Sequence, residues 1–537
     1  MNGREKSGLS IVAENPANKA GQPGAERGER RERAKGNAGQ TDTYRTPSRA
    51  GVSPGLDRVR QAAKAGKETR FTALLHHLDV ALLGWAYSQL KRDAAVGVDD
   101  VTWAEYGQGL EARLTDLHGR VHRGAYRAQP SRRHYIPKPD GRQRPLGIAA
   151  LEDKIVQRAL VEILNAIYEE DFLGFSYGFR PGRGQHDALD ALVVAIETRK
   201  VNWILDADIR SFFDTVSHEW LLRFLERRVG DRRVLRLIRK WLKVGVVENG
   251  ARIPATMGTP QGAVISPLLA NVYLHYVFDL WAKEWRERHA RGEVIVVRYA
   301  DDTVMGFEHR TDAVRFLADL EKRMAEYALA LHPDKTRLIE FGRLAAANRK
   351  ARGLAKPETF DFLGFTHICG RTRKGRFQVR RRSRRDRMWA KLQAVKEELR
   401  RRMHASAAEQ GKWLASVVLG YFKYHGVPNN GDALAAFRYH VIGIWRGVLR
   451  RRSDKDRTTW DEINRLAKWW LPRPRICHPW PDRRFAVTHP RWEPYAGKPH
   501  VRFCAGGAQQ CASLPRPSSC CNRFARRSMR PVREISR

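Results

Sequence analysis

Four acidic residues lie in two short segments that are otherwise rich in apolar residues. Asp301 and Asp302 interrupt the run EVIVVRYADDTVMGFE, and Asp206 and Asp208 stand two apart in LDADIRSFFD. Burying adjacent carboxylates is costly unless cations neutralise them. Mg²⁺ prefers carboxylate oxygens, and two such ions about 3.5–4 Å apart can stabilise the attacking and leaving oxygens of an in-line displacement at phosphorus. The pattern predicts a two-metal phosphoryl-transfer site; solvated acids in a surface turn and on an edge strand are the alternatives.

Strand-forming sequence surrounds both acidic segments. Residues 201–209 are β-rich, and residues 293–308 predict two strands with a turn at Ala300-Asp301. Asp206 and Asp208 would share one face of their strand, because side chains alternate along a strand. Short strands mix with helices from about 130 to 365, so we expect an α+β sheet domain to position the acids.

Helical patterns precede and follow this domain. The first runs from Phe71 to Asp93, where we expect the packed body to begin. Beyond residue 370, helices are predicted at roughly 384–403, 406–425 and 431–451, with a further one over TTWDEINRLAKWWL. A Pro- and Trp-rich stretch from 472 to 500 is expected to be extended.

The charge balance indicates a polyanionic partner. The 537 residues carry a formal net charge of +40, with a pI of about 10.6. Nucleic acid is the first candidate and a membrane surface the second. Residues 371–387 hold ten Lys or Arg against one acid, and aromatic residues recur beyond them. This segment is either a solvated face or an RNA-binding groove.

Other patterns bear on the compartment. No run of about 18 apolar residues is present, so no spanning helix is expected. The six cysteines are few and poorly spaced for a disulfide framework, which favours a reducing, cytoplasmic setting. Their spacing also gives little support for a structural zinc site.

Seven sequence blocks, in this order, resemble the proteins encoded by group II introns. They are YIPKPDGRQRPLGI, SYGFRPGRGQHDAL, DADIRSFFDTVSH, GTPQGAVISPLLANVYLH, RYADD, LALHPDKTRLIEF and FDFLGF. The resemblance extends over about residues 70 to 500. It implies an α+β right-hand polymerase, with fingers and palm, followed by an all-α thumb that serves as the maturase-specific domain.

The resemblance also divides the chain into parts. They are a disordered basic arm (1–55), the reverse transcriptase fingers and palm (56–368), a helical thumb or maturase domain (369–455), a DNA- or RNA-binding extension (456–503) and a disordered basic tail (504–537). No His-Asn-His nuclease pattern follows. Priming from a nascent strand at a replication fork is therefore expected, rather than independent cleavage of the second target strand.

The resemblance assigns catalytic roles to four residues. Asp208, Asp301 and Asp302 would hold the metals, with Asp302 the weaker ligand and Asp206 a supporting acid. Lys335, in HPDKT, would protonate the leaving pyrophosphate, although a phosphate-positioning or structural role is equally open.

Further residues would bind the nucleotide and the primer. Phe213 would be the steric gate against a 2′-hydroxyl, with an ordinary core Phe as the alternative. The other implied nucleotide-binding residues are Lys138, Arg144, Tyr299, Gln261 and Gly262. A solvated basic turn remains the alternative for Lys138 and Arg144. Phe362, Leu363 and Gly364 resemble a primer grip, or else form a plain core strand.

The function implied is an RNA-directed DNA polymerase that uses two Mg²⁺ ions, with Mn²⁺ as a substitute. Its partners would be an RNA template with a DNA primer, deoxynucleoside triphosphates, target DNA and the parent intron RNA, whose splicing it would assist; no membrane is expected. The alternatives are an idle splicing cofactor, a reverse transcriptase of another lineage and a viral-type RNA polymerase. The intact acids argue against the first, the SYGFRPGRGQHDAL block against the second and Phe213 against the third.

Overall fold

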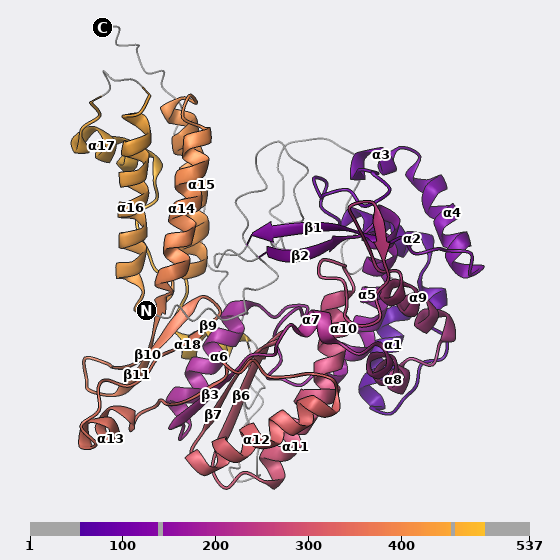
Figure 1. Ribbon diagram of the computed structural model, residues 1–537, viewed down its shortest axis with the longest axis horizontal. Helices are drawn as coiled ribbons and strands as arrows, with labels where there is room; N and C mark the ends of the chain where they lie inside the picture. The colour runs from indigo at the N-terminus through magenta and orange to yellow at the C-terminus, as the bar shows by residue number, and fades with distance from the viewer. Residues whose placement is uncertain (1–53, 138–142, 453–456, 489–537) are drawn as a thin grey trace, which may run out of the picture. The chain divides into compact units, whose positions relative to one another are not determined.

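The computed structural model describes residues 54–137, 143–452 and 457–488 (Figure 1). The expected basic arm up to residue 53, the basic tail and Lys138 lie outside the described residues. Within these ranges the protein is α+β, as predicted, with two four-stranded sheets and one three-stranded sheet. No described helix is long and apolar enough to cross a membrane.

The central sheet carries both acidic segments. Its antiparallel strands are β6 (Val294–Tyr299), β7 (Asp302–Phe307), β3 (Trp203–Ala207) and β8 (Arg337–Glu340). Every residue of β6 and β7 is buried, which explains their continuous apolar runs. The helices nearby are α6 (Gln185–Thr198), α10 (Ser266–Leu274), α11 (Leu280–Arg288) and α12 (Arg310–Glu326). The predicted pair of strands, with its turn at Ala300-Asp301, is confirmed.

The N-terminal part combines a second sheet with many helices. Its strands are β1 (Ser131–Pro137), β2 (Gln143–Ile148), β4 (Val246–Glu248) and β5 (Ala251–Ile253). Its helices are α1 (Pro54–Ala65), α2 (Val80–Ser88), α3 (Trp103–Gly107), α4 (Leu110–His122), α5 (Leu151–Asp171), α7 (Phe212–Thr215), α8 (His218–Arg228) and α9 (Arg232–Lys243).

The packed body begins earlier than the sequence pattern suggested. Helix α1 buries Leu56, Val59 and Ala63 and packs against α5, so the expected start near Phe71 was wrong. The single helix expected from Phe71 is also shorter, because the Asp79 side chain accepts the Leu82 N–H at 2.7 Å and starts α2 there.

The helical thumb follows the predicted pattern. Its helices are α14 (Arg385–Arg401), α15 (Ala407–His425), α16 (Gly431–Leu449) and α17 (Trp460–Trp470). Their apolar faces form one core around Trp445, which is fully buried and donates its Nε1–H to Gln410 Oε1 at 2.9 Å. The predicted three helices and the fourth over TTWDEINRLAKWWL are confirmed.

The basic segment before the thumb is largely a β-hairpin. β9 (Phe360–Phe362), β10 (Phe365–Arg371) and β11 (Phe377–Ser383) form the third sheet, after the short helix α13 (Ala345–Ala351). Arg381 is buried and contacts Asp190 of α6 at 2.7 Å. Part of the positive charge of residues 371–387 is therefore paired within the protein. Neither a solvated face nor an RNA-binding groove accounts for the whole segment.

The segment 472–488 returns from α17 to the central domain. It ends in helix α18 (Pro481–Thr488), so the extended conformation expected for 472–500 was wrong for residues 481–488. Phe485 is buried in the same apolar cluster as α6 residues. This C-terminal return segment thus belongs to the packed body.

Candidate active site

The acids of the two segments meet at one end of the central sheet. Residues Tyr299 and Asp302 pair across the β6–β7 hairpin and leave Ala300-Asp301 as its tip. β3 runs antiparallel to β7, with Ala207 opposite Thr303. One further step in this register places Asp208 opposite Asp302. The sequence-predicted metal ligands are therefore brought together by sheet pairing.

The surroundings of Asp301 disfavour its charged form. Burial, with a smaller contribution from the negative charge of Asp208, raises the pKa of Asp301 to about 6, although a backbone hydrogen bond and the cations of Arg144 and Arg298 partly oppose the shift. Lys335 Nζ lies 3.2 Å from Asp208 Oδ2, so this predicted catalytic lysine neutralises the second acid. Asp206 instead faces Arg337 at 4.0 Å, consistent with a supporting role.

A divalent cation fits this chemistry. Burial and the charge of Asp208 make the ionised form of Asp301 costly, and a cation between the oxygens of these two carboxylates would stabilise it. Across the described parts of the chain, no three His, Cys, Asp or Glu side chains are already arranged as a metal-ligand group. Asp208 and Asp301 form the pair that would hold the ions, with Asp302, which is buried at the start of β7, beside them.

Arg298 supports the tip of the catalytic hairpin from within the core. Its guanidinium is fully buried and pairs with Asp279 through hydrogen bonds of 2.7 and 2.6 Å. It also donates to the Ala300 carbonyl at 2.9 Å, to Asn271 Oδ1 at 3.1 Å and to Ser176 Oγ at 2.7 Å. Asp279 belongs to a π-helical turn (His275–Asp279) between α10 and α11, a feature frequent at functional sites.

The hairpin tip is also held by its backbone neighbours. Ala300 has φ +57°, a left-handed conformation that costs a non-glycine residue about 1–2 kcal/mol. Gly178 lies directly against it, since a Cβ on Gly178 would stand 2.3 Å from the Ala300 nitrogen. Asn271 Nδ2 donates to the Gly178 carbonyl at 2.7 Å. These contacts hold the strained turn in place.

Sequence reasoning missed the roles of Arg298, Asp279, Asn271 and Gly178. One signal was available, because Arg298 is a charged residue inside an apolar strand that precedes the acids. A charge in such a position requires a partner. The partner itself could not be identified, because Asp279 lies 19 residues away on a helix.

The expected nucleotide-binding residues lie on several elements. Phe213 is buried in α7, edge-on to Phe212, and its carbonyl accepts the Thr259 N–H at 2.7 Å. Arg144 on β2 is close enough to Asp301 and Asp214 for both acids to raise its pKa, although burial lowers it on balance. Tyr299, at the end of β6, is buried.

The loop with Gln261 and Gly262 packs against strand β2. The Gln261 carbonyl accepts the Gly147 N–H at 2.6 Å. Gly262 has φ +108°, and a Cβ there would lie 2.8 Å from the Gly147 carbonyl oxygen. Gly262 thus allows this loop to lie close to the protein's own backbone at Gly147.

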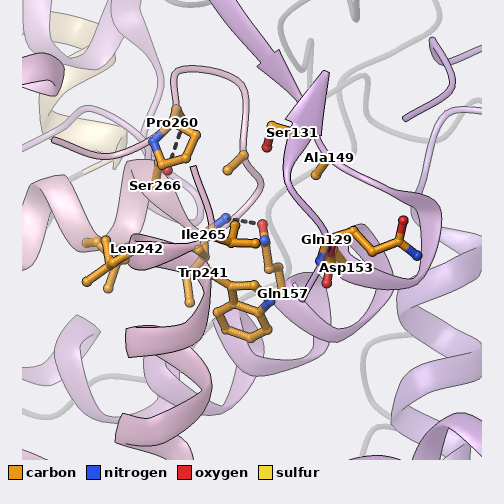
Figure 2. A pocket seen from close by; sticks show the side chains of 13 residues that line it. Gln129, Ser131, Ala149, Asp153, Gln157, Trp241, Leu242, Pro260, Ile265 and Ser266 are labelled. Carbon is orange, nitrogen blue, oxygen red and sulfur yellow. Dashed lines mark hydrogen bonds between the residues drawn. The ribbon is translucent and has the colours of Figure 1, made fainter. Parts of the chain in front are cut away.

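A small cavity lies behind this loop and is separate from the acids. Figure 2 shows it between β1, α5 and the loop, lined by residues that include Gln157, Trp241 and Pro260. Its volume of about 10 Å³ is enough for roughly one water molecule. Burial raises the pKa of Asp153 at its edge to about 6. The cavity is too small for a nucleotide.

The expected primer grip is a two-residue turn between β9 and β10. Leu363 has φ +46° and Gly364 φ +80°, as a type I′ turn requires. Tyr424 of α15 donates its hydroxyl to the Leu363 carbonyl at 2.8 Å, and the Arg384 N–H bonds the Gly364 carbonyl at 3.1 Å. Phe362 and Leu363 are both buried in the core, and Gly364 is the one partly exposed residue of this motif.

One cation from the thumb approaches the acids. Burial and nearby Arg384 lower the pKa of Arg387, while Asp302, Asp386 and Tyr424 oppose that change. Arg387 is in the first turn of α14. The thumb thus contributes positive charge beside the catalytic hairpin, a feature that the sequence blocks did not indicate.

Comparison with known proteins is consistent with this geometry. Residues 136–367 match the family described as reverse transcriptase (RNA-dependent DNA polymerase). Protein YkfC of Escherichia coli (strain K12) is 34% identical over 316 residues, which are 53% of this chain and 78% of that protein. The group II intron-encoded protein LtrA of Lactococcus lactis subsp. cremoris is 34% identical over 245 residues, 44% of this chain and 40% of LtrA.

A putative COX1/OXI3 intron 1 protein of Saccharomyces cerevisiae is 29% identical over 228 residues, 41% of this chain and 26% of its own length. The chain thus spans less than half of the two intron proteins. The paired acids, the hairpin that carries them and these matches together show that the chain belongs to the reverse transcriptase and maturase family encoded by group II introns.

Proposed function

We propose that this protein polymerises DNA on an RNA template, using two Mg²⁺ ions held by Asp208 and Asp301 with Asp302 as the weaker ligand. The observation that carries the proposal is the position of Asp301 at a hairpin tip beside Asp208, where burial and like charge raise the Asp301 pKa to about 6. The ions would stabilise the attacking and leaving oxygens of nucleotide addition.

The surrounding side chains would orient the substrates. Arg144, near Asp301, would bind the triphosphate in a bidentate manner, together with Lys138. Phe213 would occupy the space needed by a 2′-hydroxyl and so favour deoxynucleotides. Lys335 Nζ lies 3.2 Å from Asp208, and this ion pair would break when the ions bind. Lys335 would then donate a proton to pyrophosphate.

The remaining expected contacts belong to this proposal as well. Tyr299, Gln261 and Gly262 would line the nucleotide site. The turn formed by Leu363 and Gly364 would position the primer 3′ end, since its carbonyls are fixed by the thumb.

The thumb would give the protein a second activity. LtrA is named as a group II intron-encoded protein, and the present chain has a basic helical domain beyond the palm. We propose that this domain binds the parent intron RNA and assists its splicing. The same complex would copy the intron into target DNA from a DNA primer.

Primer extension tests the polymerase directly. The reaction contains poly(rA), oligo(dT), dTTP and Mg²⁺, with Asp301→Asn beside the wild type. The matched control is Asp116→Asn, which neutralises an exposed acid on α4. We expect extension by the wild type and the control but none by Asp301→Asn, which should still bind RNA. A folded wild type without extension would favour the idle splicing cofactor.

A further inference from the structure

A continuous row of aromatic side chains lies on the outside of the thumb. Trp389 of α14 contacts His440 of α16, with ring centroids 4.8 Å apart, and Tyr439 adjoins His440 at 5.6 Å. Tyr439 stacks parallel to Trp460 of α17, at 6.1 Å and an interplanar angle of 5°. The guanidinium of Arg446 lies 4.8 Å from the centroid of Trp460. We call these five residues the aromatic row.

The aromatic row is exposed although its rings are large. Tyr439 is 62% exposed, Trp389 46% and Trp460 42%. The helices that carry it are neighbours in the bundle (Figure 1) and bury their opposite faces in the thumb core. The row is therefore not needed to close that core, and large aromatic side chains gathered at a surface commonly mark an interaction site.

Two glycines, Gly443 and Gly447, lie within α16, the helix that carries Tyr439 and His440, although glycine inside a helix is destabilising relative to alanine. A Cβ on Gly447 would meet nothing within 4 Å, and one on Gly443 would meet only Trp460, at 3.6 Å. Contacts within the described protein therefore do not require a glycine at Gly447. A flat surface next to stacked rings suits the close approach of a planar group.

Two arginines lie near the row. Arg446 is held in place by its bond to the Thr458 carbonyl at 3.0 Å, and Arg450 is the C-cap residue of α16, one turn later. Aromatic faces and arginines together recognise unpaired bases and the phosphates that join them. Folded RNA presents such bases in loops and bulges, whereas duplex DNA does not.

We propose that the aromatic row stacks on unpaired bases of a structured RNA, separately from the template–primer at the polymerase site. The inference rests on the proposed maturase function and adds the surface through which RNA is held. It uses none of the residues assigned to metal, nucleotide or primer binding.

The test measures binding of a labelled RNA hairpin with an adenosine loop. A saturating unlabelled oligo(rA)–oligo(dT) duplex without unpaired bases is present so that the polymerase site is occupied. We expect Tyr439→Ala and Trp460→Ala each to weaken hairpin binding roughly tenfold, within the range for loss of one ring–base stack. Tyr439→Phe, which keeps the ring, should bind as the wild type does.

The matched control is Trp469→Ala. Trp469 is 82% exposed on α17, the helix that carries Trp460, but its ring makes none of the contacts of the row. Equal losses for Trp469→Ala and Trp460→Ala would overturn the proposal. So would an equal loss for a fully paired RNA of the same stem.

Primer extension separates this result from failure of the proposed polymerase. The row variants should extend oligo(dT) at the wild-type rate and melt at the wild-type temperature. Absence of extension by the wild type contradicts the polymerase assignment alone. Normal extension with unchanged hairpin binding by Tyr439→Ala and Trp460→Ala contradicts the aromatic row alone.

Discussion

Replacing Arg298 should both destabilise the protein and slow catalysis. Arg298 and Asp279 are each fully buried, and the guanidinium makes five hydrogen bonds. In Arg298→Met the Asp279 carboxylate would remain buried without its cation. Removing one partner of a buried ion pair typically costs about 3–5 kcal/mol. That loss is a large fraction of the ~5–15 kcal/mol by which a typical domain is stable.

A double variant separates the ion pair from the remaining contacts. Arg298→Met with Asp279→Leu removes both charges, and apolar replacement of a buried pair is often close to neutral. The Ala300 carbonyl, which accepts from Arg298 at 2.9 Å, would still lack its donor, at about 1–3 kcal/mol. We therefore expect the double variant to be more stable than Arg298→Met, while primer extension stays slow because the hairpin tip is no longer held.

Urea unfolding, followed by tryptophan fluorescence and circular dichroism, measures the stabilities of the wild type, both single variants and the double variant. The reasoning is refuted if Arg298→Met costs less than about 1 kcal/mol, which is below the range for a broken buried pair. Additive costs in the double variant would also refute it, since contacting charges must couple. Normal extension by a folded Arg298→Met would show that the Ala300 contact does not position Asp301.

Three further predictions follow from the same contacts. Gly178→Ala should reduce primer extension at least tenfold, because its Cβ would meet the Ala300 nitrogen at 2.3 Å; a wild-type rate would show that the hairpin tolerates displacement. Phe213→Ala should admit ribonucleotides, measured as the ratio of UTP to dTTP incorporation, and an unchanged ratio would remove the gate. Burial lowers the pKa of His425 from 6.5 to about 3, so below pH 6.5 the unfolded chain binds a proton that the folded chain does not. Relative to His425→Gln, the wild type should therefore lose about 2 kcal/mol of unfolding free energy by pH 5, and a pH-independent difference between the two in urea unfolding would contradict this.

The sequence predicted the parts of the site that depend on local pattern. Apolar β-rich runs around paired acids predicted the strands and the turn that carry Asp208 and Asp301, and sheet pairing then brings those acids together. The network around Arg298 could not be predicted in this way. Its partners lie on a helix and in a loop as far as 122 residues away, and their meeting depends on tertiary packing.

The contacts of the C-terminal return segment could not be predicted from the sequence either. His478 stacks on His186 of α6, at 3.9 Å, and bonds the Lys423 carbonyl of α15 at 2.6 Å. Arg484 contacts Asp187 and lies 3.5 Å from Asp190. A proline- and tryptophan-rich sequence gives no periodicity from which such contacts could be inferred.

Because the last described segment joins the base of α15 to α6, the orientation of the thumb depends on residues that follow it in the chain. The nucleic-acid-binding role expected for residues 456–503 stays a prediction, and side chains such as His478 and Arg484 are already engaged within the protein.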